Sequence, residues 1–171
     1  MKDFPLSPHF TFYEFTNTGF SDLLEHNRER GYKERQRLRE LAQMMEGIRG
    51  GLDNNAIEIH SGFRGPELNA RVGSSDVSQH LKAEAVDFSL AGPDDENSWE
   101  KTFQEVLGYL ISTGTMFGQL IKETQAVRGY PRKYWLHLSL GAPYREIWRC
   151  GQVLLMKDGR YEILKRIPFG R

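Results

Sequence analysis

The chain has 171 residues, of which 39% are hydrophobic, 27% charged and 12% aromatic, so it is long enough to bury a core as one domain. Its 23 basic and 23 acidic side chains give a formal net charge of zero, which argues against a general nucleic-acid binder. With Cys150 as the single cysteine, neither an internal disulfide nor a cysteine-based zinc site is expected. We expect one domain over 1–171, with an N-terminal arm at 1–33 and a C-terminal hairpin at 151–166.

The first residues, MKDFPLSPHF, lack the apolar core of a secretory signal, and no stretch approaches the length of a membrane span. We therefore expect synthesis in the cytoplasm without a signal peptide, and no membrane partner. If the protein acts outside the membrane, another route must take it there.

The elements predicted for the N-terminal half begin with an extended entry and a short turn or helix around Phe12–Phe15. Residues 21–32 are polar, with Gly31 as a candidate helix break. Apolar residues recur at helical spacing from Leu38 to Ile48, which predicts a helix over 34–48 that ends at Gly50-Gly51. Further predictions are a strand at 57–60, a short helix at 66–72 and a serine-rich loop at 73–79.

A helix and several strands are predicted for the C-terminal half. Ser98 is expected to cap a helix that runs to about Ser112, and Gly114 is expected to end it. Asp158-Gly159 between two apolar runs predicts a β-hairpin turn. The strands are predicted at 84–90, 117–124, 134–140, 152–156 and 160–164. All these elements together predict an α+β fold, with a mainly antiparallel sheet and helices packed against it.

Three of these strands place a potential metal ligand or acid on the face opposite the core, namely His60, Asp87 and His137. Val86 and its neighbours at every second position face the core, which leaves Asp87 on the other face, and His137 has the same position in its own strand. His80 lies seven residues before Asp87, an odd separation that would put the two on opposite faces of one continuous strand. His80 is therefore expected in the loop before the strand, folded back toward Asp87.

Two imidazoles and one carboxylate form a ligand set for zinc, which in catalytic sites takes three protein ligands and a water molecule. Such an ion makes hydrolysis feasible at neutral pH, provided that a nearby carboxylate accepts the proton of the water. The spacing alone is a weak signal for such a site and on this ground favours dispersed surface and core histidines, with the metal site as the alternative.

Four short motifs follow one another along the chain: SGFR at 61–64, SQH at 78–80, AVD at 85–87 and WLHLS at 135–139. Together they resemble the motifs of the M15-type zinc peptidases, which include D-alanyl-D-alanine carboxypeptidases and peptidoglycan endopeptidases and share a fold with the hedgehog signalling domain. The resemblance runs from about Phe10 to Trp148 and implies a hedgehog/DD-peptidase-like fold.

The resemblance also implies the roles of individual residues. His80, Asp87 and His137 match the ligands of Zn²⁺. Arg64 matches an arginine that contacts a substrate carboxylate or carbonyl, a task for which the guanidinium fork is suited; the alternative is a structural ion pair. Ser78 is expected either to touch the substrate or to support its own loop.

The general base is predicted to be Glu123. Many of the resembled peptidases have an acid three residues before the last histidine, where this chain has Tyr134, which cannot accept the proton. The phage-type branch instead carries its acid in a strand that reads like FDQLI-x-E, and the corresponding segment is FGQLIKE at 117–123. The alternative is an exposed acid at the end of a strand.

Two residues depart from the motifs. Ala83 stands at the glycine of the H-x-x-G pattern, and His60 stands where the resembled peptidases often have a small polar residue. We interpret His60 as a packing histidine rather than a group that supports the metal ligands. Arg145 and Glu146 are interpreted as structural.

The resemblance implies a zinc peptidase of bacterial peptidoglycan, acting on a stem peptide or cross-bridge as a carboxypeptidase or an endolysin-like endopeptidase. Metal-activated water would attack the peptide carbonyl, with Glu123 as base and Arg64 orienting the substrate. It also suggests a phage or prophage protein that reaches the wall after phage-type release or as part of a virion. The alternative is a non-catalytic zinc domain that binds wall fragments or a partner protein; no nucleic-acid partner is expected, and the oligomeric state stays open.

Overall fold

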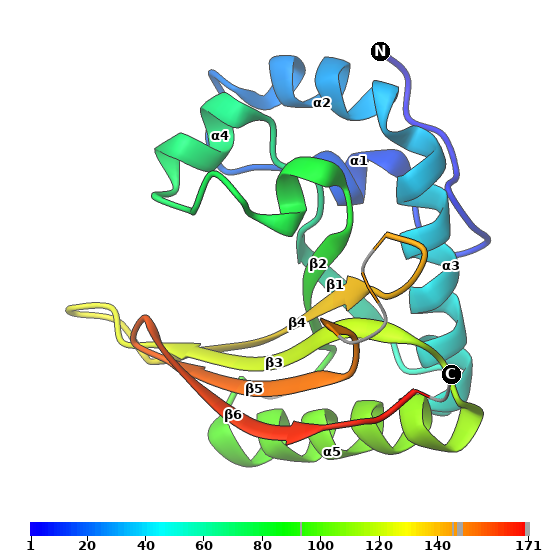
Figure 1. The fold of residues 1–171 in the computed structure, drawn as a ribbon. Coiled ribbons are helices and arrows are strands. Elements are labelled where there is room, and N and C mark those ends of the chain that lie inside the picture. The colour runs from blue at the N-terminus through cyan, green and yellow to red at the C-terminus, as the bar shows by residue number, and fades with distance from the viewer. Residues whose placement is uncertain (93, 145, 147–148, 170–171) are drawn as a thin grey trace. The chain divides into compact units, whose positions relative to one another are not determined.

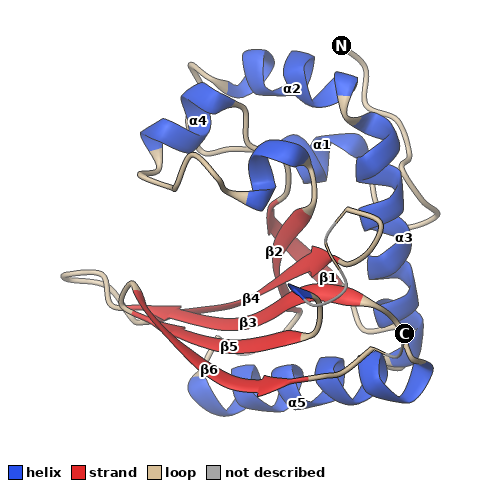
Figure 2. Ribbon diagram, viewed as in Figure 1, coloured by secondary structure: helices blue, strands red, loops and turns tan. Residues whose placement is uncertain are grey.

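A computed structural model describes residues 1–92, 94–144, 146 and 149–169. These residues form five α-helices, one 3₁₀ helix and a six-stranded sheet with the strand order β1-β2-β4-β3-β5-β6 (Figure 1, Figure 2). The strand pairs β3/β4 and β5/β6 are antiparallel, whereas β3/β5 is parallel, so the sheet is mixed. The predicted α+β fold class is confirmed.

The chain divides into two compact units. Unit 1 comprises Met1–Gly47 and Ile59–Asp87, and unit 2 comprises Ile48–Glu58 and Phe88–Arg171. Three elements continue from one unit into the other: α3 (Arg35–Gly51), β1 (Ile57–Ser61) and β2 (Ala85–Leu90). The site residues predicted from the sequence are therefore contributed by both units.

Unit 1 is mainly helical. Besides α3 it contains α1 (Phe12–Thr16), α2 (Leu24–Lys33), α4 (Pro66–Arg71) and the 3₁₀ helix η1 (Gln79–Lys82). α1 begins at a capping box, in which the side chains of Thr11 and Glu14 each accept a hydrogen bond from the other's backbone N–H. The apolar stripe predicted for α3 is fully buried, from Leu38 to Ile48. The predicted helices at α1, α3 and α4 are thus confirmed.

Gly31 lies inside α2 and does not break it, contrary to the prediction. A Cβ atom at this position would lie 2.8 Å from Thr16 Cγ2 and 3.1 Å from Phe63 Cδ1, so close packing explains the glycine. The helix continues because these tertiary contacts outweigh the intrinsic cost of a helical glycine, about 1 kcal/mol. The predicted stop at Gly50-Gly51 is also displaced, since α3 includes both residues.

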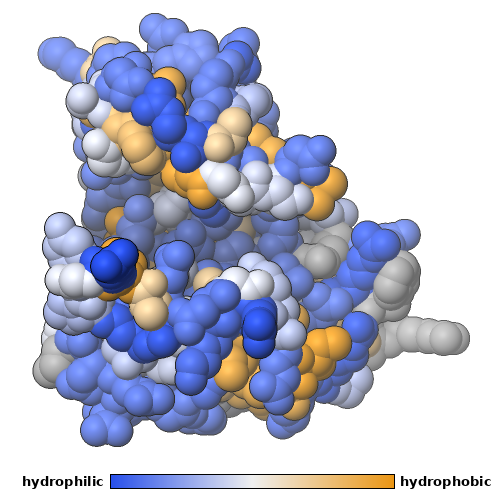
Figure 3. Space-filling view, turned by 90° about the vertical axis from the view of Figure 1, so that its left-hand side faces the viewer, coloured by the Kyte–Doolittle hydropathy of each residue, from blue (hydrophilic) through white to orange (hydrophobic). Residues whose placement is uncertain are grey.

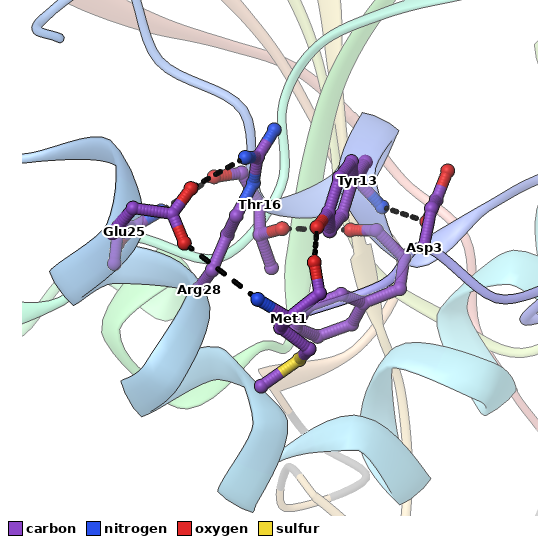
Figure 4. A network of polar contacts seen from close by, with 8 residues as sticks. Met1, Asp3, Tyr13, Thr16, Glu25 and Arg28 are labelled. Carbon is purple, nitrogen blue, oxygen red and sulfur yellow. Dashed lines mark hydrogen bonds and ion pairs between the residues drawn. The ribbon is translucent and has the colours of Figure 1, made fainter.

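Polar contacts fasten the start of the chain to α1 and α2, as Figure 4 shows. The guanidinium of Arg28 lies over the ring of Tyr13, 3.6 Å from its centroid, and donates a hydrogen bond to Glu25 at 2.8 Å. The backbone N–H of Tyr13 donates to Asp3 at 2.9 Å, and its hydroxyl donates to the carbonyl of Met1. The segment before α1, residues 1–11, is therefore held by both backbone and side-chain groups, and it is called the arm from here on.

Glu46 of α3 holds the same arm in a pH-dependent way. Its carboxylate accepts hydrogen bonds from Ser7 Oγ at 2.8 Å and from the backbone N–H of His9 at 2.7 Å. Burial raises the pKa of Glu46, but these hydrogen bonds and the contact with the His9 ring outweigh it, so the pKa lies below the ordinary 4.5. A lowered pKa in the folded state stabilises the fold above the unfolded pKa, and this stabilisation is lost as the pH falls through the folded value.

We expect the arm to loosen as the pH falls below 4.5, before the rest of unit 1 unfolds. The measurement is the backbone NMR signal of His9, followed from neutral pH into the acid range. Glu46→Gln cannot titrate at this position and is the control. A wild-type signal that stays constant to the point of global unfolding would contradict the prediction.

Unit 2 contains the larger part of the sheet and one long helix. Its elements are α5 (Glu96–Thr113), β3 (Phe117–Gln125), β4 (Lys133–Leu140), β5 (Gln152–Lys157) and β6 (Arg160–Arg166). α5 packs on one face of β3 and β4 (Figure 1). Trp99 of α5 donates to the carbonyl of Trp135 at 3.0 Å, and Lys122 Nζ lies 5.2 Å from the centroid of the Trp99 ring. The other face of these strands carries the predicted site residues of this unit.

α5 begins three residues earlier than predicted. Its N-cap is Asp95, whose backbone is extended and whose carboxylate accepts a hydrogen bond from the N–H of Ser98 at 2.9 Å. Ser98 is therefore inside the first turn. Asp95 is favoured because a carboxylate both accepts this hydrogen bond and interacts favourably with the helix dipole. Gly114 ends the helix in the left-handed conformation, with a φ of 66°, as predicted.

The predicted C-terminal hairpin is confirmed. Asp158 and Gly159 both have positive φ, 50° and 81°, which is the conformation of the tight turn that suits twisted antiparallel strands. The guanidinium of Arg132 contacts both carboxylate oxygens of Asp158, at 3.1 and 3.0 Å. The loop between β3 and β4 is thereby tied to the hairpin turn.

On the face drawn in Figure 3 the surface is mainly hydrophilic, and the hydrophobic side chains form small separate groups. Among the described residues, the large hydrophobic side chains with the greatest exposure are Val77, Tyr130, Tyr161 and Ile163. In the described parts of the chain, no helix combines the length and the apolar character needed to cross a bilayer.

Candidate metal centre

His80 lies in η1, immediately before β2, and its side chain is only 2% exposed. His80 lies before the strand, as predicted, but in a short 3₁₀ helix rather than in a loop. Ser78 is the N-cap of η1, and its hydroxyl accepts a hydrogen bond from the N–H of His80 at 3.4 Å. Ser78 thus supports its own loop, and its contact with a substrate stays a prediction.

The ring of His80 is oriented by a backbone carbonyl. Nδ1 lies 2.6 Å from the oxygen of Gly62, and because a carbonyl can only accept, Nδ1 carries the proton. In the neutral ring Nε2 is then the acceptor nitrogen, which is the state in which histidine binds a metal.

Nε2 of His80 lies 3.2 Å from Oδ1 of Asp87. Two acceptors at this distance repel each other unless a cation lies between them, and that cation is either a metal ion or a proton on Nε2. Two ligands of one tetrahedral zinc, each about 2.0–2.2 Å from the metal, are about 3.3–3.6 Å apart. The pair therefore fits a metal site with little adjustment.

The carbonyl of Gly62 accepts the hydrogen bond from the His80 ring, and the residue is packed so closely that no side chain fits at this position. A Cβ atom would lie 2.4 Å from the carbonyl oxygen of Phe15, which itself accepts a hydrogen bond from the N–H of Phe63 at 2.7 Å. We expect Gly62→Ala to lower the free energy of unfolding by about 1–3 kcal/mol through overpacking. Displacement of the Gly62 carbonyl should also weaken metal binding.

Chemical denaturation and metal titration measure the two effects of Gly62→Ala. Gly50→Ala in α3 is the matched control, because a Cβ there meets nothing within 4 Å and alanine favours the helix. A Gly62→Ala variant as stable as the wild type would show that the loop yields to the methyl group.

Asp87 is shared between His80 and Arg64. Its Oδ2 lies 3.7 Å from Nη2 of Arg64, and the two side chains are 14% and 16% exposed. The backbone N–H of Arg64 donates to the carbonyl of His80 at 3.1 Å, so all three residues belong to one local network in unit 1. The ion pair favoured by the alternative interpretation of Arg64 is present, and its contact with a substrate stays a prediction.

Ala83 ends η1 in the left-handed conformation, with φ 55° and ψ 33°, and is fully buried. This conformation explains why the resembled peptidases have glycine at the position, since glycine adopts it without steric cost. For alanine the conformation costs about 1–2 kcal/mol, which the surrounding packing must offset. The backbone beside His80 nevertheless adopts the turn.

In unit 2, Glu123 and His137 lie on the same face of the sheet. The register pairs Glu123 with Trp135 and Ile121 with His137. Opposed residues share a face, and so do residues two apart, which makes Glu123 and His137 diagonal neighbours with Cα atoms about 7–8 Å apart. Each side chain is 8% exposed.

The neighbours of Glu123 within the sheet include three apolar side chains. Trp135 lies opposite it on β4 and Met156 beside it on β5, while Ile121 precedes it on the same face. Ile121 and Met156 belong to one buried cluster, with Trp135 packed against it. Glu123 is therefore a buried acid within a strand, and the alternative of an exposed acid at a strand end is wrong.

The same face continues to Ser139, two residues beyond His137. The register of β3 against β4 shifts between Phe117 and Leu120, which is a β-bulge or comparable irregularity. The N–H of Gln119, inside this irregularity, donates to Ser139 Oγ at 2.9 Å. The side chain of Ser139 thus replaces a hydrogen bond of the regular ladder.

The remaining residues that the sequence motifs singled out are His60, Tyr134, Arg145 and Glu146. His60 is exposed in β1, so its interpretation as a packing histidine is wrong. Tyr134 packs against Trp99, with ring centroids 5.1 Å apart. The carbonyl of Glu146 accepts a hydrogen bond from the N–H of Arg149 at 2.8 Å, in line with a structural role, whereas Arg145 lies outside the described residues.

The three predicted ligands, His80, Asp87 and His137, form a group that could hold a metal ion. Each offers one ligand atom, and the three atoms lie within 4.8 Å of one another. His80 and His137 are buried and Asp87 is half-buried, so these donors are largely shielded from water.

A protein-family model described as Peptidase M15 matches residues 13–114. The matched segment contains Arg64, Ser78, His80 and Asp87, and it ends before Glu123 and His137. The last two assignments therefore depend on the sequence motifs and on the geometry of β3 and β4. No curated protein matches the sequence.

Proposed function

Because the chain belongs to the peptidase M15 family, we propose that it is a zinc-dependent peptidase that hydrolyses peptide bonds of bacterial peptidoglycan. Family membership supports a metallopeptidase, and the choice of zinc and of the substrate belongs to the proposal. The observation that carries it is the close approach in unit 1 of His80 Nε2 and Asp87 Oδ1, which lie 3.2 Å apart while the Gly62 carbonyl holds the other ring nitrogen.

A zinc ion bound by His80, Asp87 and His137 would polarise the substrate carbonyl and make a water molecule acidic enough to attack it. Glu123 would take the proton from the water and pass it to the leaving amine. Its place on the same face as His137, flanked by apolar side chains, supports this role, because few water molecules compete for the proton there. Arg64 would orient a carboxylate or carbonyl of the substrate.

The proposed substrate is a stem peptide or cross-bridge of the wall. The similarity of residues 117–123 to the phage-type branch supports a phage or prophage enzyme, released during lysis or carried in the virion. In that setting the protein acts as an endolysin-like endopeptidase. The alternative activity is that of a D-alanine carboxypeptidase, which hydrolyses a peptide bond by the same chemistry. The products distinguish the two.

The test is digestion of purified muropeptides, both monomeric and cross-linked, by protein of measured zinc content. Mass spectrometry should show addition of one water across one type of peptide bond. Loss of a terminal alanine identifies a carboxypeptidase, and opened cross-links identify an endopeptidase. Chelation should abolish cleavage and added zinc should restore it. No cleavage by protein with one zinc per chain would refute the catalytic proposal.

A second candidate is a non-catalytic zinc domain that binds wall fragments. Two observations favour it: alanine occupies the left-handed position next to the ligand loop, and Tyr134 replaces the acid found before the last histidine. This candidate predicts saturable, zinc-dependent binding of muropeptides by calorimetry. The mass of the bound muropeptide would then be unchanged after prolonged incubation.

A further inference from the structure

Asn27 of α2 is a buried polar residue that joins separate segments of unit 1. Its side chain is 2% exposed. Nδ2 donates to the carbonyl of Thr16 at 2.9 Å and to the carbonyl of Phe63 at 3.1 Å, and Oδ1 accepts from the N–H of Gly65 at 2.7 Å. Two carbonyls on one side and an N–H on the other allow only one orientation of the amide.

Asn27 binds the backbone on both sides of Arg64. The carbonyl of Phe63 precedes Arg64, and the N–H of Gly65 follows it. The N–H of Arg64 itself donates to the carbonyl of His80 at 3.1 Å. The backbone around Arg64 is thus held at three points, which fixes where the side chain leaves the backbone before any ligand binds.

We propose that Asn27 is a positioning residue that holds the guanidinium of Arg64 beside Asp87. Asn27 acts through Arg64 and touches neither substrate nor metal. Loss of its amide would leave the Phe63 carbonyl and the Gly65 N–H buried without their partner, and the segment would move to hydrate them. The kinetic consequence rests on the proposed function, whereas the structural consequence can be measured without it.

The structural test is labelling of the full chain with phenylglyoxal, followed at each arginine by peptide mass spectrometry. In the wild type, Arg64 is 16% exposed and paired with Asp87, and should react slowly. In Asn27→Ala we expect Arg64 to react roughly tenfold faster, with the rate of exposed Arg39 in α3 unchanged as the internal reference. An unchanged Arg64 rate in folded Asn27→Ala would overturn the proposal.

Ser7→Ala is the matched control, because it removes a side-chain hydrogen bond of the same unit, Ser7 Oγ to Glu46 Oε1 at 2.8 Å, that involves neither Asn27 nor its partners. Faster labelling of Arg64 in this control as well would indicate general loosening and would also overturn the proposal. Asn27→Asp keeps the acceptor for Gly65 but loses both donors, and it replaces the alanine variant if that variant does not fold. The expected result for Asn27→Asp is the same acceleration.

The kinetic test is a double-mutant cycle on muropeptide hydrolysis. Asn27→Ala should lower kcat/KM roughly tenfold, and it should add little in an Arg64→Ala background, because the residue it acts through is already absent. Losses that multiply independently would overturn the proposal. If the wild type shows no hydrolysis, the proposed function fails and the labelling result still decides the role of Asn27.

Discussion

Replacing His80 by alanine should remove bound zinc and hydrolytic activity together. The ring supplies one of three predicted ligands, it is almost fully buried, and its other nitrogen is already tied to Gly62. Changes in groups that only support a ligand cost roughly 10–100-fold in metal affinity, so loss of a ligand should cost more than about 100-fold. Zinc content after dialysis, measured by atomic spectrometry, and the muropeptide digest check the two effects.

His26→Ala provides the matched control in the same unit. His26 is exposed and contacts Glu67 and Arg30 on the surface, so its removal should change neither zinc content nor hydrolysis. Circular dichroism must show that His80→Ala is folded. A folded His80→Ala protein with wild-type zinc content would exclude His80 as a ligand.

Replacing Glu123 by glutamine should leave zinc bound and reduce turnover by about 10²–10⁴-fold, which is the usual contribution of a general base. Glutamine has nearly the same shape, so packing against Trp135 and Met156 should be preserved. The effect should fall on kcat, with little change in KM, because the proton is transferred only during the reaction.

Glu162→Gln on the exposed strand β6 controls for a change of charge in the same sheet. It should hydrolyse muropeptides at the wild-type rate. Near-wild-type turnover of Glu123→Gln would move the general base to another residue. Loss of zinc from Glu123→Gln would instead show that the carboxylate supports the metal ligands.

The sequence predicted those elements that depend on local pattern. Alternating and helical spacing located β2, β4 and α3, and the Asp158-Gly159 pair located the hairpin, because each signal reflects a conformational preference of the residues themselves. The odd separation of His80 and Asp87 predicted that His80 precedes β2 and folds back toward Asp87, which the structure confirms, although His80 lies in a 3₁₀ helix rather than a loop.

The features that the sequence left undetermined depend on contacts between distant segments. Gly31 serves packing against Phe63 rather than a helix end, and its neighbours in sequence do not reveal this. Nothing in the sequence marks Asn27 as a structural residue, because its partners are backbone groups that lie 11 to 38 residues away. Asp95 competes with Ser98 as a helix cap within one polar run, and propensities alone rank the two as nearly equal.

The irregularity between Phe117 and Leu120 has a consequence for tolerated changes of chain length. Because β3 carries one extra residue there relative to β4, deletion of that residue would restore a regular ladder and leave the pairing from Leu120 onward unchanged. Deletion of a single residue between Leu120 and Glu123 would instead turn the carboxylate toward α5. Homologues of different length can therefore share the orientation of this acid if their insertions and deletions fall at the start of the strand.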